Sequence, residues 1–181
     1  MVTGYFVLSA LIGLLSLVRG YEIVPTVEDG IPDHLSFTTA PFLKIGHGYY
    51  YIESNAQKNW FEASESCHRL GAKLISFETI QEWDLINRYL LKNKIYNVYW
   101  TSGSDLAHQG KHDWLETGER ITLPIWYPGE PNNFNGNEHC DELGDRGSSD
   151  NYNVLNDRPC ETPRRYICER SYPRTASFII W

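Results

Sequence analysis

The densest group of polar side chains lies in the last third of the chain, over residues 127–160. It carries carboxylates and carboxamides with few cations among them: Glu130, Asn132, Asn133, Glu138, Asp141, Glu142, Asn156 and Asp157. Such oxygens are the ligands of hard cations, and calcium takes about six to eight of them. The EF-hand spacing is absent, so the ligands would come from separate loops. The alternative interpretation is an acidic loop that is simply solvated.

No arrangement of nucleophile, base and acid is evident in the chain. The six histidines are scattered, and neither a His-Glu-x-x-His nor a Gly-x-Ser-x-Gly motif occurs. The strongest enzymatic alternative is a glycosidase with Glu130 and Glu138 as its carboxylate pair. Carboxylates that hold a metal make poor general acids, so these residues favour binding over catalysis. The net charge of −7, from 16 Lys and Arg against 23 Asp and Glu, argues against nucleic acid as a partner.

The N-terminal residues 1–20 predict a secretory signal peptide. Residues 5–18 are apolar or small and carry no charge, and Val18 and Gly20 suit cleavage after residue 20. This run is too short to span a bilayer comfortably, and no second run of membrane length follows. We therefore expect a secreted, extracellular protein that does not insert into a membrane.

Four cysteines in a secreted chain predict two disulfides, with none left for an intermolecular bridge. They are Cys67, Cys140, Cys160 and Cys168, and the residues alone allow three pairings. No Cys-x-x-Cys pair occurs, which disfavours a zinc ribbon or a thioredoxin-type site.

Two amphipathic helices are predicted in the first half of the compact region. Asn59 and Glu62 suit a capping box at the start of the first helix, and Gly71 suits its end. Its apolar face consists of Trp60, Ala63, Cys67 and Leu70. Because Cys67 lies on this face, we expect its side chain to point into the core. Thr79 and Glu82 suit a second capping box at the start of the next helix. The apolar face of that helix consists of Trp83, Ile86 and Leu90.

A turn and a short strand are predicted at residues 44–54, and further short strands at residues 72–77, 98–103, 112–116 and 165–169. Residues 106–112 and 127–159 are rich in Gly, Asn, Asp and Pro and show no regular pattern, and such long stretches are usually functional. Residues 21–41 predict an extended or loose leader, too short and patternless for a coiled coil. Residues 173–181 form a tail that ends in the apolar sequence FIIW.

Several of these features, in their order along the chain, resemble the C-type lectin-like domain, specifically its sugar-binding members. The resemblance covers residues 42–172 and suggests a secreted, single-domain member of the invertebrate type. The matching features are Cys67 in the first helix, the Trp100-x-x-Gly103 strand, the Trp114 segment, Glu130-Pro131-Asn132, Glu138 before Cys140, Asn156-Asp157 before Cys160, and Cys168 in the last strand. A lone Glu-Pro-Asn would be weak evidence, whereas the ordered set is specific.

The resemblance implies an α+β fold with two helices, small antiparallel sheets and a long loop region that binds calcium and sugar. It implies the disulfides Cys67–Cys168 and Cys140–Cys160. It also implies one calcium site whose ligands contact the sugar as well: Glu130, Asn132, Glu138, Asn156 and Asp157. The Glu130–Pro131 peptide bond would be cis, which turns both flanking side chains toward the same ion.

The resemblance further implies that two adjacent sugar hydroxyls bind the metal directly. Carboxylates accept hydrogen bonds and amide NH2 groups donate them, so a mixed set suits hydroxyl groups. The Glu-Pro-Asn order resembles the mannose-type motif, whereas the galactose type reads Gln-Pro-Asp. We therefore expect glycans with mannose, fucose or N-acetylglucosamine-like sugars, recognised on microbes or cells in innate immunity. Galactose binding and protein ligands are the alternatives.

Three departures from the family pattern stand out. Leu155 occupies the position before Asn156-Asp157 where the family commonly has Trp, which predicts a smaller buried support. The segment DRGSSDNYN, residues 145–153, adds length between Cys140 and Asn156. Asp105 suits a second, auxiliary calcium site, but Gln109 and Asn133 stand where acids are wanted, so one calcium is expected.

Overall fold

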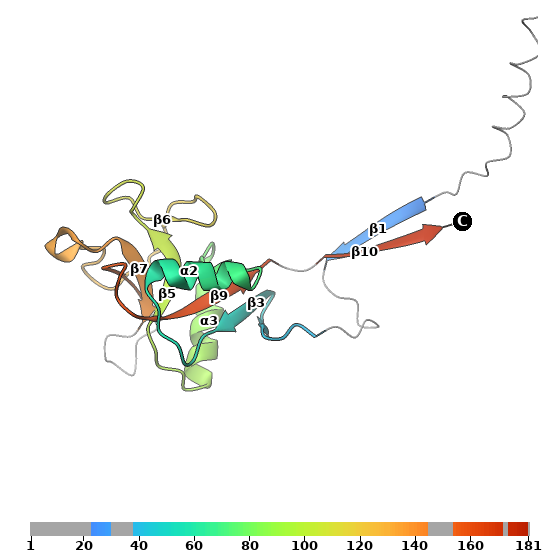
Figure 1. The fold of residues 1–181 in the computed structure, drawn as a ribbon, viewed down its shortest axis with the longest axis horizontal. Helices are drawn as coiled ribbons and strands as arrows, with labels where there is room; N and C mark the ends of the chain where they lie inside the picture. The colour runs from blue at the N-terminus through green and yellow to red at the C-terminus, as the bar shows by residue number, and fades with distance from the viewer. Residues whose placement is uncertain (1–22, 30–37, 145–153, 172–173, 181) are drawn as a thin grey trace, which may run out of the picture. The chain divides into compact units, whose positions relative to one another are not determined.

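The structure is a computed structural model that describes residues 23–29, 38–144, 154–171 and 174–180 (Figure 1). The chain divides into two compact units: one spans Thr38–Tyr172, and the other contains two paired strands near the termini. The predicted signal peptide and residues 145–153 lie outside the described residues. The described helices include none that is long and apolar enough to cross a bilayer.

The first helix of the larger unit, α2 (Trp60–Arg69), begins with the predicted capping box. The Asn59 side chain accepts a hydrogen bond from the Glu62 N–H at 2.9 Å, and the Glu62 carboxylate accepts one from the Asn59 N–H at 3.3 Å. Gly71 follows the helix with a φ of 65°, a left-handed conformation that glycine adopts without strain. The predicted start and end of this helix are confirmed.

The second helix, α3 (Ile80–Lys92), has only half of its predicted capping box. Thr79 accepts a hydrogen bond from the Glu82 N–H at 3.2 Å, as expected. The Glu82 carboxylate, however, accepts hydrogen bonds from the Tyr50 hydroxyl at 2.7 Å and from the Glu78 N–H at 3.4 Å instead of one from the Thr79 N–H. The contact with Tyr50 is a tertiary one, which sequence spacing does not reveal.

The main sheet has the strand order β2-β3-β9-β5-β7-β8, with β4 paired to β9 and β6 paired to β5. Among the strand pairs of this sheet that the structure describes, β5–β9 alone is parallel. The bounds are β2 Leu43–Ile45, β3 Gly48–Ile52, β4 Lys73–Leu74, β5 Tyr99–Ser104, β6 Asp113–Trp114, β7 Cys140–Gly144, β8 Val154–Arg158 and β9 Arg165–Arg170. The strand expected at residues 72–77 is therefore only two residues long. The expectation that residues 127–159 lack regular structure is wrong, because β7 and β8 lie within them.

Both predicted disulfides are present, and the first of them, together with two tryptophans, fixes α2 to the sheet. Cys67–Cys168 joins α2 to β9, and Cys140–Cys160 joins the start of β7 to the segment after β8. The Trp60 indole donates to the Thr101 carbonyl at 2.8 Å, and the Trp100 indole donates to the Lys58 carbonyl at 3.0 Å. Figure 1 shows α2 lying beside β5 and β9, which it contacts. The predicted α+β class is confirmed.

A second cluster of buried side chains fills the space between α3 and the sheet. Ile86 and Leu90 on α3 are fully buried, and Trp83 packs against the same cluster, as the helical periodicity predicts. Leu155, the residue in place of the family's tryptophan, is also fully buried in this cluster. Trp126 forms a bridge with Leu155 and packs against the cluster, so an aromatic side chain from another segment adds to the support beneath β8.

The smaller unit is a two-stranded antiparallel ribbon. It pairs β1 (Ile23–Asp29) with β10 (Arg174–Ile180) residue for residue along both strands. The predicted leader and tail therefore meet each other, and most of the apolar FIIW sequence belongs to β10.

Candidate functional site

The five predicted ligand residues come from three places around β7 and β8. Glu130 and Asn132 flank Pro131 in the loop before β7, and the Glu130–Pro131 peptide bond is cis, as expected. Glu138 precedes β7 by two residues. Asn156 and Asp157 lie on β8, opposite Glu142 and Asp141 of β7 in the antiparallel ladder. The ladder thus fixes Asn156 and Asp157 on a buried strand, while the loop carries the other residues.

Asp157 joins the Glu-Pro-Asn loop to β8. One carboxylate oxygen accepts a hydrogen bond from the Asn132 N–H at 3.0 Å, and the other accepts one from the Asn133 N–H at 2.7 Å. Asp157 has no exposed surface. Because a buried carboxylate is costly unless it is hydrogen-bonded, these two N–H groups position the loop against the strand. Asn132 and Asp157, predicted to act together, are thereby brought together.

Glu138 is held by the same loop and by a cation. Its carboxylate accepts hydrogen bonds from the Phe134 N–H and from the Arg158 guanidinium, both at 3.1 Å. Its own N–H donates to the Asn133 side chain at 3.0 Å. Arg158 also contacts Glu142 at 2.9 Å, so one guanidinium bridges two carboxylates. Arg158 was not expected at this site from the sequence, although it directly follows Asn156-Asp157 in the chain.

Asn156 presents an unsatisfied acceptor. Its amide nitrogen donates to the Asp157 carbonyl at 2.7 Å and to Glu142 at 3.3 Å. Its side-chain oxygen is buried and accepts no hydrogen bond from the part of the chain that the structure describes. A buried acceptor left without a donor is costly, and a cation is one group that would satisfy it.

The donor set suits calcium, although its members do not form a closed cage. Three carboxylates and two amides are hard oxygen ligands of the kind that calcium prefers. Among the described residues, no three His, Cys, Asp or Glu side chains already converge as metal ligands. Backbone N–H groups and Arg158 occupy the oxygens of Asp157 and Glu138. A bound ion would have to displace some of these contacts, Arg158 above all.

The three positions considered for an auxiliary calcium are not assembled into a site. One Asp105 oxygen contacts His139 at 2.8 Å, and the other accepts a hydrogen bond from the Gly110 N–H at 2.6 Å. Gln109 is exposed. Asn133 is used by Glu138 and Asp157, as described above. Asp105 is therefore satisfied within the protein, by a histidine and a backbone amide.

His112 and Asp141 form a buried pair beneath the site; the sequence indicated Asp141 as a candidate oxygen ligand but not its pairing with His112. The two side chains are 2.8 Å apart, and Asp105 lies 3.8 Å from the other imidazole nitrogen. Burial lowers the pKa of His112, but the hydrogen bond and charge of Asp141 outweigh it and the net pKa is raised. Burial raises the pKa of Asp141 to about 6, against the opposing effect of His112. The pair therefore tends to retain a shared proton, and no local motif indicates it.

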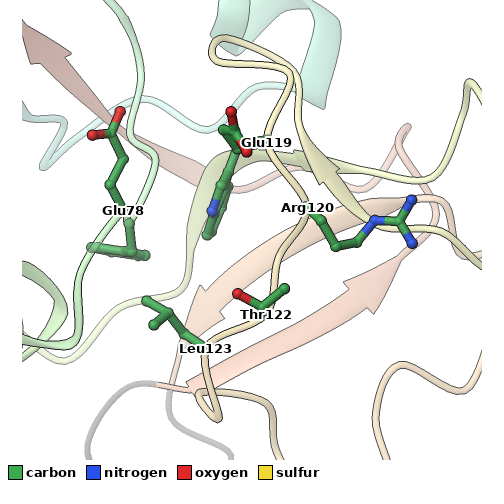
Figure 2. A pocket seen from close by; sticks show the side chains of 7 residues that line it. Glu78, Glu119, Arg120, Thr122 and Leu123 are labelled. Carbon is green, nitrogen blue, oxygen red and sulfur yellow. The ribbon is translucent and has the colours of Figure 1, made fainter.

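A cavity of about 210 Å³ lies apart from these residues, against the buried Trp114 (Figure 2). Figure 2 shows Glu78 on one side and Arg120 on the other, with the Arg120 guanidinium pointing away from Glu78. Thr122 and Leu123 complete the wall. None of the five predicted ligand residues lines this cavity, so the cavity is not part of the candidate calcium site.

Comparison with known proteins identifies the family of this chain. The family model described as "Lectin C-type domain" matches residues 56–170. A curated relative, C-type lectin 37Da of Drosophila melanogaster, is 36% identical over 167 residues, which cover 90% of this chain and 89% of the relative.

Two solved structures share the fold. The cow carbohydrate-recognition domain of CD23, crystallised in the presence of GlcNAc2Man3 oligosaccharide, has a TM-score of 0.61 at 24% identity, covering 75% of this chain and 97% of that one. A calcium-independent type II antifreeze protein has a TM-score of 0.63 at 21% identity, covering 78% and 99%. The chain belongs to the C-type lectin domain family.

Proposed function

We propose that this chain is a secreted, calcium-dependent lectin that binds glycans with vicinal hydroxyl groups. The proposed ligands are mannose, fucose or N-acetylglucosamine-like sugars on microbial or cell surfaces, in innate immunity. The observation that carries the proposal is the attachment of the Glu-Pro-Asn loop to β8 through Asp157, beside the unsatisfied oxygen of Asn156. Carbohydrate binding is the activity of the family, and no chemical step on the glycan is proposed.

The side chains at this site suit the recognition of hydroxyl groups. Glu130, Asn132, Glu138, Asn156 and Asp157 would hold the ion, which when bound supplies coordination positions for two adjacent hydroxyls. Asn132 is exposed and Glu130 is partly exposed, so these two can reach a ligand from the solvent side. Glu130 can accept a hydrogen bond from a sugar hydroxyl, and the Asn132 amide can donate one.

A glycan array in calcium and in chelator tests the proposal. Binding should require calcium, and calcium should raise the melting temperature, because a ligand that binds only the folded state stabilises it. Asp157→Asn should abolish calcium-dependent binding. Asp84→Asn is the matched control, since Asp84 lies on α3 in an ion pair with Arg88. Equal binding of the parent in calcium and in EDTA would rule out the proposed mechanism.

The sugar preference is tested at the two residues that flank Pro131. Exchanging them in the double variant Glu130→Gln, Asn132→Asp keeps one carboxylate in the pair and reverses donor and acceptor. We expect a shift from mannose-like toward galactose-like sugars of about 1–2 kcal/mol, since one or two hydrogen bonds are re-paired. A parent that already prefers galactose would contradict the mannose assignment while leaving the calcium mechanism intact.

A second candidate function is calcium-independent binding of a protein ligand. Arg158 favours it, because its guanidinium already neutralises Glu138 at 3.1 Å. The fold neighbour described as calcium-independent shows that this fold occurs without the ion. A melting temperature indifferent to calcium, together with an empty glycan array, would favour this candidate.

A further inference from the structure

The cavity beside Trp114 has walls that the fold holds in place. Its volume is about 210 Å³. The Trp114 ring packs edge-to-face against Phe77, with the ring centroids 5.8 Å apart, and both rings are almost fully buried. The Trp114 backbone N–H donates to the Glu119 carbonyl at 2.8 Å, and the Trp114 carbonyl accepts from the Gly118 N–H at the same distance. This turn and the ring pair together fix one wall of the cavity.

The floor of the cavity contains a hydrogen-bond donor that has no acceptor. The indoles of Trp60 and Trp100 each donate to a backbone carbonyl, at 2.8 and 3.0 Å. The indole N–H of Trp114 donates to no acceptor among the described residues, although only 2% of Trp114 is exposed. Those residues do not enclose its nitrogen completely, so it faces the open space that Trp114 lines. Because buried polar groups are normally hydrogen-bonded, this N–H is available to a ligand in the cavity.

Acceptors without a donor lie at the mouth of the cavity. Glu78 and Glu119 line it and are exposed, and within the described part of the chain their carboxylates accept no hydrogen bond and form no ion pair. Arg120 also lines the cavity, but it pairs with Asp113, and Figure 2 shows its guanidinium pointing away from Glu78. The mouth therefore carries uncompensated negative charge, which disfavours an anionic ligand.

These two kinds of unpaired group define the chemistry of a ligand. The Trp114 indole requires an acceptor, whereas the two carboxylates require donors. A simple cation would satisfy the carboxylates but would place positive charge against the indole N–H. An amide group is neutral and has both a carbonyl acceptor and an N–H donor. The volume of about 210 Å³ lies below the range of about 300–1,000 Å³ that is usual for drug-sized ligands, so the cavity suits a single sugar residue or a smaller group.

We propose that this cavity binds the acetamido group of an N-acetylated amino sugar and that this binding needs no calcium. The acetamido carbonyl accepts a hydrogen bond from the Trp114 indole, and the acetamido methyl group packs against Leu123. The amide N–H and the ring hydroxyls donate to Glu119 and Glu78. None of the candidate calcium ligands lines the cavity, so it is a second contact for a glycan, separate from the calcium site proposed above.

A titration followed by NMR tests the proposal on the parent protein. The probe is methyl N-acetyl-β-glucosaminide, added to isotope-labelled protein in EDTA, and the signal is the indole N–H of Trp114. We expect this signal to shift and to saturate. Methyl β-glucoside lacks the acetamido group and should leave the signal unchanged at the same concentrations. Equal shifts with both sugars, no shift with either, or a shift that requires calcium would overturn the proposal. Because the chelator removes calcium, a failure of the proposed calcium mechanism would not change this result.

Substitution at the mouth tests the role of the carboxylates. Glu119→Gln replaces a charged acceptor by a neutral one and should weaken binding of the amino sugar about three- to tenfold. Glu65→Gln is the matched control and should bind as the parent does, because Glu65 is 63% exposed on α2 in an ion pair with Arg69. An equal loss in both variants, or a loss in neither, would overturn the assignment. Methylammonium that shifts the Trp114 signal as strongly as the amino sugar would also overturn it, since the cavity would then be a cation site.

Discussion

Glu169 is a carboxyl group whose neutral form the fold favours, so Glu169→Gln should stabilise the protein at neutral and alkaline pH. Glu169 lies on β9 with 15% of its side chain exposed, and it contacts the Ser76 N–H at 3.1 Å and the Lys73 ammonium at 3.2 Å. Burial raises the pKa of Glu169 to about 7, the charge of Glu82 adds to the increase, and the Ser76 and Lys73 contacts oppose it.

The size of the effect follows from proton linkage. The unfolded chain releases this proton near a pKa of 4.5, and the folded chain holds it up to a pKa of about 7. The folded state binds more protons in this window, so the free energy of unfolding falls as pH rises through it. At 1.36 kcal/mol per pKa unit the shift corresponds to about 3 kcal/mol, and we expect about 2 kcal/mol because Glu169 retains some contact with water.

Urea unfolding followed by tryptophan fluorescence measures this difference. Parent and Glu169→Gln should be equally stable near pH 4, and the variant should become more stable by about 2 kcal/mol near pH 8. Glu65→Gln is the matched control, because Glu65 is 63% exposed on α2 and its removal tests the loss of charge without burial. A difference that stays constant with pH, or that appears equally in the control, would refute the reasoning.

Three further predictions concern the surroundings of the site. Gly103→Ala should cost about 2 kcal/mol or more in urea unfolding, because the added methyl group would lie 2.8 Å from the Asp141 Cβ and closer still to its carboxylate. Arg158→Gln should raise calcium affinity by about 1 kcal/mol in titration calorimetry, because it removes a cation from Glu138, and an unchanged affinity would contradict the competition. Retention on a sugar resin should fall as pH drops from about 7 to about 5 and be restored by excess calcium, since protons compete with the metal. An acid loss that ignores calcium would implicate a histidine instead.

Local signals predicted the helices well. The Asn59 cap, the stop at Gly71 and the spacing of Trp60, Ala63 and Cys67 act within a few residues, so a single sequence contains them. The disulfide pairing came from family resemblance, because four cysteines alone allow three pairings.

The strands β7 and β8 were missed because they do not look like strands. CDELG and VLNDR are rich in polar residues, and their central residues are buried on both faces without alternation. Polar side chains tolerate that burial because they contact each other, as Glu142 contacts Arg158 and Arg164. These partners are 16 and 22 residues from Glu142, so no local pattern reveals them.

The sequence predicted which residues lie at the candidate site better than it predicted the contacts that these residues make. The resemblance pointed to Asn132 and Asp157, and the structure joins them by a hydrogen bond. It did not point to Arg158, whose contact with Glu138 depends on the register of β7 against β8. The pairing of His112 with Asp141 was missed because 29 residues separate them and both residue types are usually solvated.

The pairing of β7 with β8 sets the positions of Asn156 and Asp157. These positions do not depend on how many residues connect the two strands. The ladder extends to the pair Gly144↔Val154, and the Cys140–Cys160 disulfide closes the other end. A change in the number of residues between Gly144 and Val154 leaves this pairing as it is, whereas a single insertion inside the ladder would shift one ligand face by a residue.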